Sequence, residues 1–119
     1  MEKKILIVDD HLDILHVVER FLKLNRFNVL AQTNGLNIHD VISSYKPDLI
    51  LLDLQIDGRL STPICKRIKE TTNIPVILFS AYLDLEKVSH ECNADAYISK
   101  PFDLEYLLNI ISEQLNVMA

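Results

Sequence analysis

Short apolar runs alternate along this chain with longer stretches in which apolar residues recur at helical spacing. The apolar runs are rich in β-branched residues, and they predict strands at 4–8, 29–31, 49–53, 75–80 and 96–99. In the first and third of these runs apolar residues follow one another directly, which is typical of a parallel strand covered by helices on both faces.

The stretches between these runs predict five helices. The apolar positions expected to face the core are Ile14, Val17, Val18, Phe21 and Leu22, then Ile38, Val41 and Ile42, then Ile64, Cys65 and Ile68, then Leu85, Val88 and Cys92, and finally Leu104, Leu107, Leu108, Ile111 and Leu115. Thr62, Asp84 and Asp103 are expected as N-caps of the last three helices. Asn93 is expected to end the fourth helix in the left-handed conformation.

Strict alternation of strands and helices indicates an α/β fold. We expect a flavodoxin-like three-layer sandwich, with a five-stranded parallel sheet of order 2-1-3-4-5 and five helices. The 119 residues suffice for one domain, so residues 1–119 are interpreted as a single domain without an effector domain. Ligands of such sheets bind beyond the carboxyl ends of the strands, where the strand order reverses.

Composition excludes several function classes. The formal net charge is −5 and the basic residues are scattered, so direct nucleic-acid binding is not expected. The apolar runs are too short to span a membrane, and the N-terminus does not have the pattern of a secretory signal. Cys65 and Cys92 are interpreted as small buried residues in a reducing compartment, so we expect a cytoplasmic protein.

The residues at the carboxyl ends of the strands are those that phosphoryl chemistry needs. Asp9 and Asp10 follow the first strand and Asp53 ends the third, and these two strands are neighbours in the expected order. Three carboxylates held together repel one another, and a divalent cation such as Mg²⁺ relieves that repulsion. Ser80 and Lys100, at the ends of the fourth and fifth strands, would supply a hydroxyl and an ammonium beside an aspartate able to attack phosphorus.

The chain resembles the receiver domains of two-component response regulators along essentially its whole length. The matching segments are 7–10 (IVDD), 47–54 (PDLILLDL), 75–81 (PVILFSA) and 94–102 (ADAYISKPF). Each segment alone is a weak signal, but all four occur in the family's order and at its separations.

The resemblance implies that Asp53 is the phosphoacceptor. It also implies that Asp10 and Asp53 bind Mg²⁺ directly, that Asp9 holds the ion through water, and that the backbone carbonyl of Gln55 is a further metal ligand. Such a protein is a phosphorylation switch rather than an enzyme.

The resemblance further implies that Lys100 contacts the phosphoryl group and that Ser80 moves toward it. Tyr97 would then change rotamer and alter the surface formed by the fourth helix, the fifth strand and the fifth helix. Pro101 matches a family proline that usually follows a cis peptide bond.

One loop departs from the family pattern. After Asp53 the family usually has a methionine–proline pair, whereas this chain has Asp57 at the proline position and Gly58 beside it. That dipeptide predicts a tighter turn. Gln55 and Tyr82 occupy positions that tune autodephosphorylation in the family, and the bulky Tyr82 is predicted to shield the phosphate from water.

The implied partners are a histidine kinase or a histidine phosphotransfer protein, together with a downstream effector protein or a fused output domain. Whether the chain forms a homodimer is left open by the sequence.

Alternatives from other function classes fit less well. A flavodoxin-type binder needs a phosphate-cradling loop where this chain has Asp10 and His11. An aspartyl-phosphate phosphatase usually needs a cap domain, and an interaction domain without phosphorylation would not need the acidic set. His11 is interpreted as an exposed residue at a helix start.

Overall fold

The computed structural model describes residues 2–81 and 84–117, so Tyr82 and its predicted shielding role lie outside the described residues. The elements in chain order are β1 (Lys4–Val8), α1 (Leu12–Leu24), β2 (Asn28–Gln32), α2 (Ile38–Tyr45), β3 (Leu49–Asp53), β4 (Gln55–Ile56), β5 (Arg59–Leu60), α3 (Thr62–Thr71), β6 (Val76–Ser80), α4 (Leu85–Glu91), β7 (Ala96–Ser99) and α5 (Leu104–Leu115).

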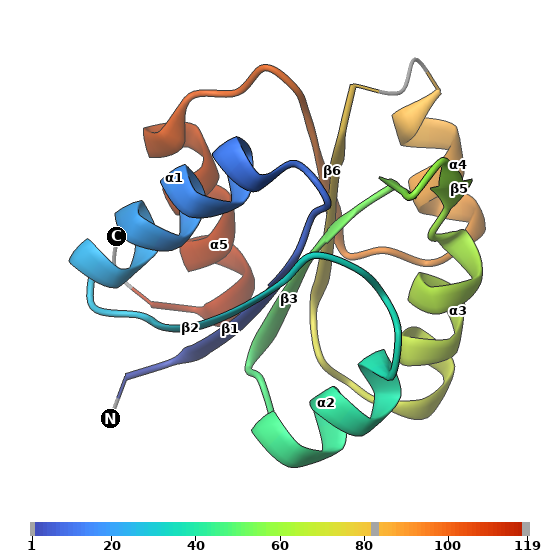
Figure 1. Ribbon diagram of the computed structural model, residues 1–119, viewed down its shortest axis with the longest axis horizontal. Coiled ribbons are helices and arrows are strands. Elements are labelled where there is room, and N and C mark those ends of the chain that lie inside the picture. Colours follow the sequence, from blue (N-terminus) through green and yellow to red (C-terminus); the bar gives the residue numbers. More distant parts are fainter. Residues whose placement is uncertain (1, 82–83, 118–119) are drawn as a thin grey trace.

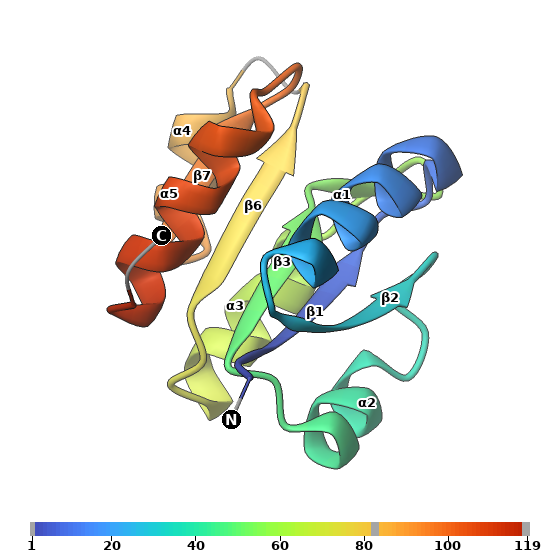
Figure 2. The same cartoon turned by 90° about the vertical axis from the view of Figure 1, so that its left-hand side faces the viewer.

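The main sheet is parallel and has the order β2-β1-β3-β6-β7. This is the predicted order 2-1-3-4-5, because β6 and β7 are the fourth and fifth strands of that sheet. Helices α1 and α5 cover one face, and α2, α3 and α4 cover the other (Figures 1 and 2). The flavodoxin-like sandwich expected from the sequence is therefore confirmed.

Alternate residues of the central strands belong to two separate cores. In β1, for example, Ile5 and Ile7 pack with α1 and α5, whereas Leu6 and Val8 pack with α2, α3 and α4. Successive side chains of a strand point to opposite faces, so a strand with helices on both sides must be apolar throughout. This explains why β1, β3 and β6 are almost entirely apolar in sequence.

Helix α1 differs from the prediction in its buried face, and helix α3 differs at its N-terminal end. Helix α1 buries Leu15, Val18 and Leu22, while Val17, predicted to face the core, is 55% exposed. Val17 lies one residue off the buried stripe, about 100° around the helix from Val18. Helix α3 begins at Thr62 and is preceded by Ser61 as its N-cap, one residue earlier than predicted.

Four other local predictions can be compared directly. Asp103 caps α5 through a bond accepted from the Glu105 N–H, and Asn93 has a φ of 62°, as expected. Asp84 occupies the N-cap position of α4, but its side chain accepts no capping bond there. The Lys100–Pro101 peptide bond is cis.

The segment after β3 forms a hairpin that was predicted only as a turn. Strands β4 and β5 pair antiparallel, and the two turn residues Asp57 and Gly58 have φ values of 53° and 74°. Positive φ at both central positions is what a type I′ turn requires, and an Asp-Gly pair favours it.

Within the part of the chain that the structure describes, none of the helices has the length and apolar character needed to cross a membrane.

Candidate phosphoacceptor site

The acidic residues meet at the carboxyl end of the sheet. Asp9 and Asp10 follow β1, and Asp53 is the last residue of the neighbouring strand β3. Asp9 is fully buried and Asp53 is only 2% exposed, although both are acidic. Buried carboxylates require partners that compensate for lost hydration, so the contacts of this cluster determine what it can do.

Backbone N–H groups hold one oxygen of each carboxylate. The His11 N–H donates to Asp9 Oδ1 at 2.8 Å, and the Gln55 N–H donates to Asp53 Oδ1 at 3.1 Å. The Asp57 N–H, at the hairpin turn, donates to Asp10 Oδ2 at 2.9 Å. These bonds orient the three side chains and leave their other oxygens available for cations.

Lys100 compensates part of the negative charge. Its ammonium lies 3.0 Å from Asp9 Oδ2 and 3.1 Å from Asp53 Oδ2, and it sits over the Phe79 ring. The Lys100 backbone N–H donates to the carbonyl of Ser80 at 2.9 Å, which ties the ends of β6 and β7 together. One ammonium against three carboxylates leaves the pocket negative overall.

The environment separates the pKa values of the two buried carboxyls. Burial raises the pKa of Asp53 to about 6; the Asp9 charge adds to this rise, and the Gln55 N–H and Lys100 oppose it. Burial also acts to raise the pKa of Asp9, but the His11 N–H and Lys100 outweigh it and hold this pKa below its ordinary value. At neutral pH Asp53 is therefore ionised, and its buried charge is costly.

The cluster has the chemistry of a site for a hard divalent cation. One ligand atom from each of Asp9, Asp10, His11 and Asp53 lies within 4.8 Å of every other. Asp10 Oδ1 is shielded from solvent and accepts no hydrogen bond from the described residues. A cation would satisfy this oxygen, and carboxylate ligands suit Mg²⁺, so the residues present fit the expected ion.

The other predicted site residues lie at different depths. The Ser80 side chain is buried at the end of β6. Gln55 is exposed and begins the hairpin. Tyr97 is 38% exposed on β7 and lines a cavity of about 300 Å³ with Ser89 of α4 and Tyr106 of α5.

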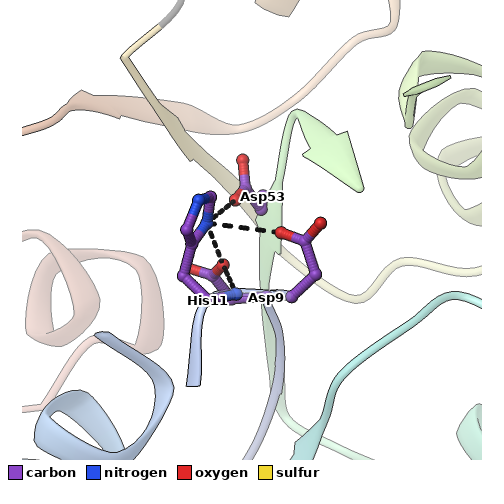
Figure 3. A group of neighbouring side chains, drawn as sticks. Asp9, His11 and Asp53 are labelled. Atoms are coloured by element: carbon purple, nitrogen blue, oxygen red, sulfur yellow. Dashed lines mark hydrogen bonds and ion pairs between the residues drawn. The ribbon is translucent and has the colours of Figure 1, made fainter. Parts of the chain in front are cut away.

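Two contacts of this site were missed by sequence reasoning. His11 is exposed, as expected, yet its Nδ1 atom lies 3.2 Å from Asp9 Oδ1, and its ring faces the carboxylates (Figure 3). Its position directly after two aspartates was the available signal. The Asp57 contact with Asp10 spans 47 residues and had no comparable signal in the sequence.

Comparison with known proteins places these features in a family. A model described as the response regulator receiver domain matches residues 5–112. Sporulation initiation phosphotransferase F of Bacillus subtilis strain 168 is 35% identical over 118 residues, covering 97% of this chain and 95% of that protein.

Two solved structures are also similar along nearly their whole length. A CheY-like response regulator receiver domain protein from Methanospirillum hungatei JF-1 has a TM-score of 0.89 and 28% sequence identity. The alignment covers 98% of this chain and 95% of the Methanospirillum chain. The BeF₃-activated N-terminal receiver domain of Klebsiella pneumoniae RstA has a TM-score of 0.88 and 26% identity, covering 95% of this chain and 98% of its own.

Proposed function

The chain belongs to the response-regulator receiver family, and on that premise we propose that Asp53 accepts a phosphoryl group from the phosphohistidine of a histidine kinase or a histidine phosphotransfer protein. The observation that carries this proposal is the position of the Asp53 carboxylate. It is buried at the end of β3, one oxygen is held by the Gln55 N–H, and the other faces the Lys100 ammonium.

The transfer forms one bond and breaks one. An Asp53 carboxylate oxygen attacks phosphorus, the bond from phosphorus to the donor imidazole breaks, and the imidazole leaves with that electron pair. Lys100 then neutralises charge on the phosphoryl oxygens. Asp9, Asp10, Asp53 and the backbone carbonyl of Gln55 would hold Mg²⁺, which when bound offsets the remaining negative charge.

An apolar surface of this protein lies beside the pocket, where the donor would dock. A groove of about 610 Å³ lies next to Lys100 and is lined mainly by apolar side chains, among them Ile14, Val17, Phe102 and Leu104. Exposed Val17 thus contributes to an apolar surface directly beside the phosphoacceptor. This supports docking of a donor whose own phosphohistidine is flanked by apolar residues.

Phosphorylation would be read out through Ser80 and Tyr97. The Ser80 hydroxyl would donate to a phosphoryl oxygen, and Tyr97 would change rotamer in response. Because Tyr97 lines a cavity together with residues of α4 and α5, its movement would alter the surface of α4, β7 and α5 and shift a two-state equilibrium. A downstream effector protein would bind this surface.

The protein would act as a stoichiometric acceptor rather than as an enzyme, because each chain carries one phosphoryl group at a time. A relative that shares 35% of its residues is nevertheless named a phosphotransferase. Passing the group on to a second histidine would be consistent with both descriptions.

Intact-mass spectrometry after incubation with acetyl phosphate tests the proposal. We expect one added phosphoryl group in Mg²⁺, none in EDTA, and peptide mapping that places it on Asp53. Asp53→Asn should not be labelled. Asp57→Asn is the matched control, because Asp57 is exposed and contacts the cluster through its backbone N–H, which the substitution retains. Equal labelling of Asp53→Asn would refute the proposal.

A further inference from the structure

His11 lies against the acidic cluster in a way that the proposed phosphotransfer does not use. Its Nδ1 atom is 3.2 Å from Asp9 Oδ1, 3.3 Å from Asp10 Oδ1 and 3.9 Å from Asp53 Oδ2. The ring therefore faces all three carboxylates from the side open to solvent, and Figure 3 shows it directed at Asp9 and Asp53. The side chain is 66% exposed, so packing does not force it into this position.

The position of the ring is set by the local backbone. His11 is the N-cap of α1, with extended φ and ψ of −88° and 101°, and its own N–H is bonded to Asp9 Oδ1. The same residue thus orients the Asp9 carboxylate through its backbone N–H and faces all three carboxylates with its ring. Helix α1 begins at the next residue, so the backbone that carries the ring is anchored.

An unsatisfied oxygen marks the place where a ligand belongs. Asp10 Oδ1 is shielded from solvent and accepts no hydrogen bond from the described residues, although His11 Nδ1 is only 3.3 Å away. A cation between the imidazole nitrogen and the three carboxylates would contact this oxygen and all four groups, which lie within 4.8 Å of one another.

We propose that His11 Nδ1 is a ligand of the divalent cation bound at this cluster, and that it gives the site a preference for transition-metal ions over Mg²⁺. Carboxylate and carbonyl oxygens suit Mg²⁺, whereas an imidazole nitrogen favours transition-metal ions, with affinity rising from Mn²⁺ through Co²⁺ to Ni²⁺. The inference rests on the proposed metal-binding role of the cluster and adds a residue that determines which metal binds.

The competing role for His11 is that of a counter-ion. In that arrangement a protonated ring would neutralise the carboxylates, and a metal would have to displace it. The two roles predict opposite effects of removing the ring. A ligand, once lost, weakens binding of imidazole-preferring ions selectively, whereas a lost counter-ion strengthens binding of every cation.

Calorimetric titration of the whole chain with Mg²⁺ and with Ni²⁺, near pH 7.5, distinguishes the metal-ligand role of His11 from the counter-ion role. For His11→Ala we expect roughly tenfold or greater weakening of Ni²⁺ binding and less than about threefold change for Mg²⁺. His16→Ala is the matched control, because His16 is exposed on the same helix, and it should change neither affinity. Thermal melts of the metal-free variants verify that both remain folded.

A spectroscopic measurement identifies the ligand directly. Electron spin echo modulation of bound Mn²⁺ should show coupling to a histidine nitrogen in the parent and in His16→Ala, and none in His11→Ala. Tighter binding of both ions by His11→Ala, equal changes for both ions, or no nitrogen coupling in the parent would overturn the assignment of His11. Failure of the parent to bind Mg²⁺ at all would instead contradict the metal-binding role of the cluster in the proposed function.

Discussion

Replacing Asp53 with asparagine is expected to stabilise the metal-free protein at neutral pH. The pKa of Asp53 rises from its ordinary value of 3.8 to about 6 because the carboxyl is buried, so the folded state disfavours its charge. One pKa unit corresponds to about 1.4 kcal/mol, which makes the cost of the ionised group about 3 kcal/mol above pH 6. Asparagine carries no charge, and its carbonyl can still accept the Gln55 N–H.

The sign of the pH dependence follows from the raised pKa. Between about pH 4 and 6 the folded parent binds more protons than the unfolded chain, so the contribution of Asp53 to stability falls as pH rises through that range. Above the folded pKa the penalty is complete. The advantage of Asp53→Asn should therefore be about 3 kcal/mol near pH 7.5 and about half of that near pH 5.

Urea unfolding followed by circular dichroism, in EDTA and at both pH values, measures this difference. Asp40→Asn, an exposed aspartate of α2, serves as the control and should change the free energy of unfolding by no more than about 0.5 kcal/mol. Adding Mg²⁺ should reduce the difference in free energy of unfolding between Asp53→Asn and the parent. Only the parent retains all three carboxylates, so it gains stability by binding the ion. A less stable Asp53→Asn near pH 7.5, or a difference that does not vary with pH, would refute the reasoning.

Three further substitutions probe other parts of the structure. Lys100→Met should destabilise the metal-free protein by about 3 kcal/mol near pH 7.5, because Asp9 and Asp53 lose their shared ammonium; unchanged urea unfolding would contradict this role. Ile68→Ala, at a fully buried position of α3, should cost about 3 kcal/mol by the same measurement, and a cost under about 1 kcal/mol would contradict its burial. Gly58→Ala should cost about 1 kcal/mol through its φ of 74° alone, because no heavy atom of the described residues, its two chain neighbours aside, lies within 4 Å of an added Cβ. Phosphorylation by acetyl phosphate should persist.

The strands and the composition of the site were predictable because both depend on local pattern. Consecutive apolar residues such as those of β3 are needed only where both faces of a strand are covered, so the sequence indicates a parallel sheet between two helix layers. Asp9, Asp53 and Lys100 each stand at the carboxyl end of a strand. Parallel strands place those ends along one edge, so a strand order of 2-1-3-4-5 already brings the three together.

Helix faces were predictable only within about one residue. Val17 has nearly the same spacing from its neighbours as Val18, and both would suit an apolar stripe in sequence. Which of them is buried depends on how α1 is rotated against the sheet and α5, and that rotation is a property of the packed core. The difference bears on the proposed docking of the donor, because the exposed Val17 lines the groove beside Lys100.

The amino-acid sequence by itself determined the class of fold and which side chains lie at the carboxyl end of the sheet, because hydrophobic periodicity and strand ends are local features. Tertiary structure alone decided that the Asp57 N–H returns to bind Asp10, 47 residues earlier in the chain. That contact depends on the path of the hairpin after β3, and hydrophobic periodicity reports which faces of helices and strands are buried, not the path of a loop. The sequence places His11 directly after the two aspartates, but only the folded backbone at the start of α1 shows that its ring lies against them.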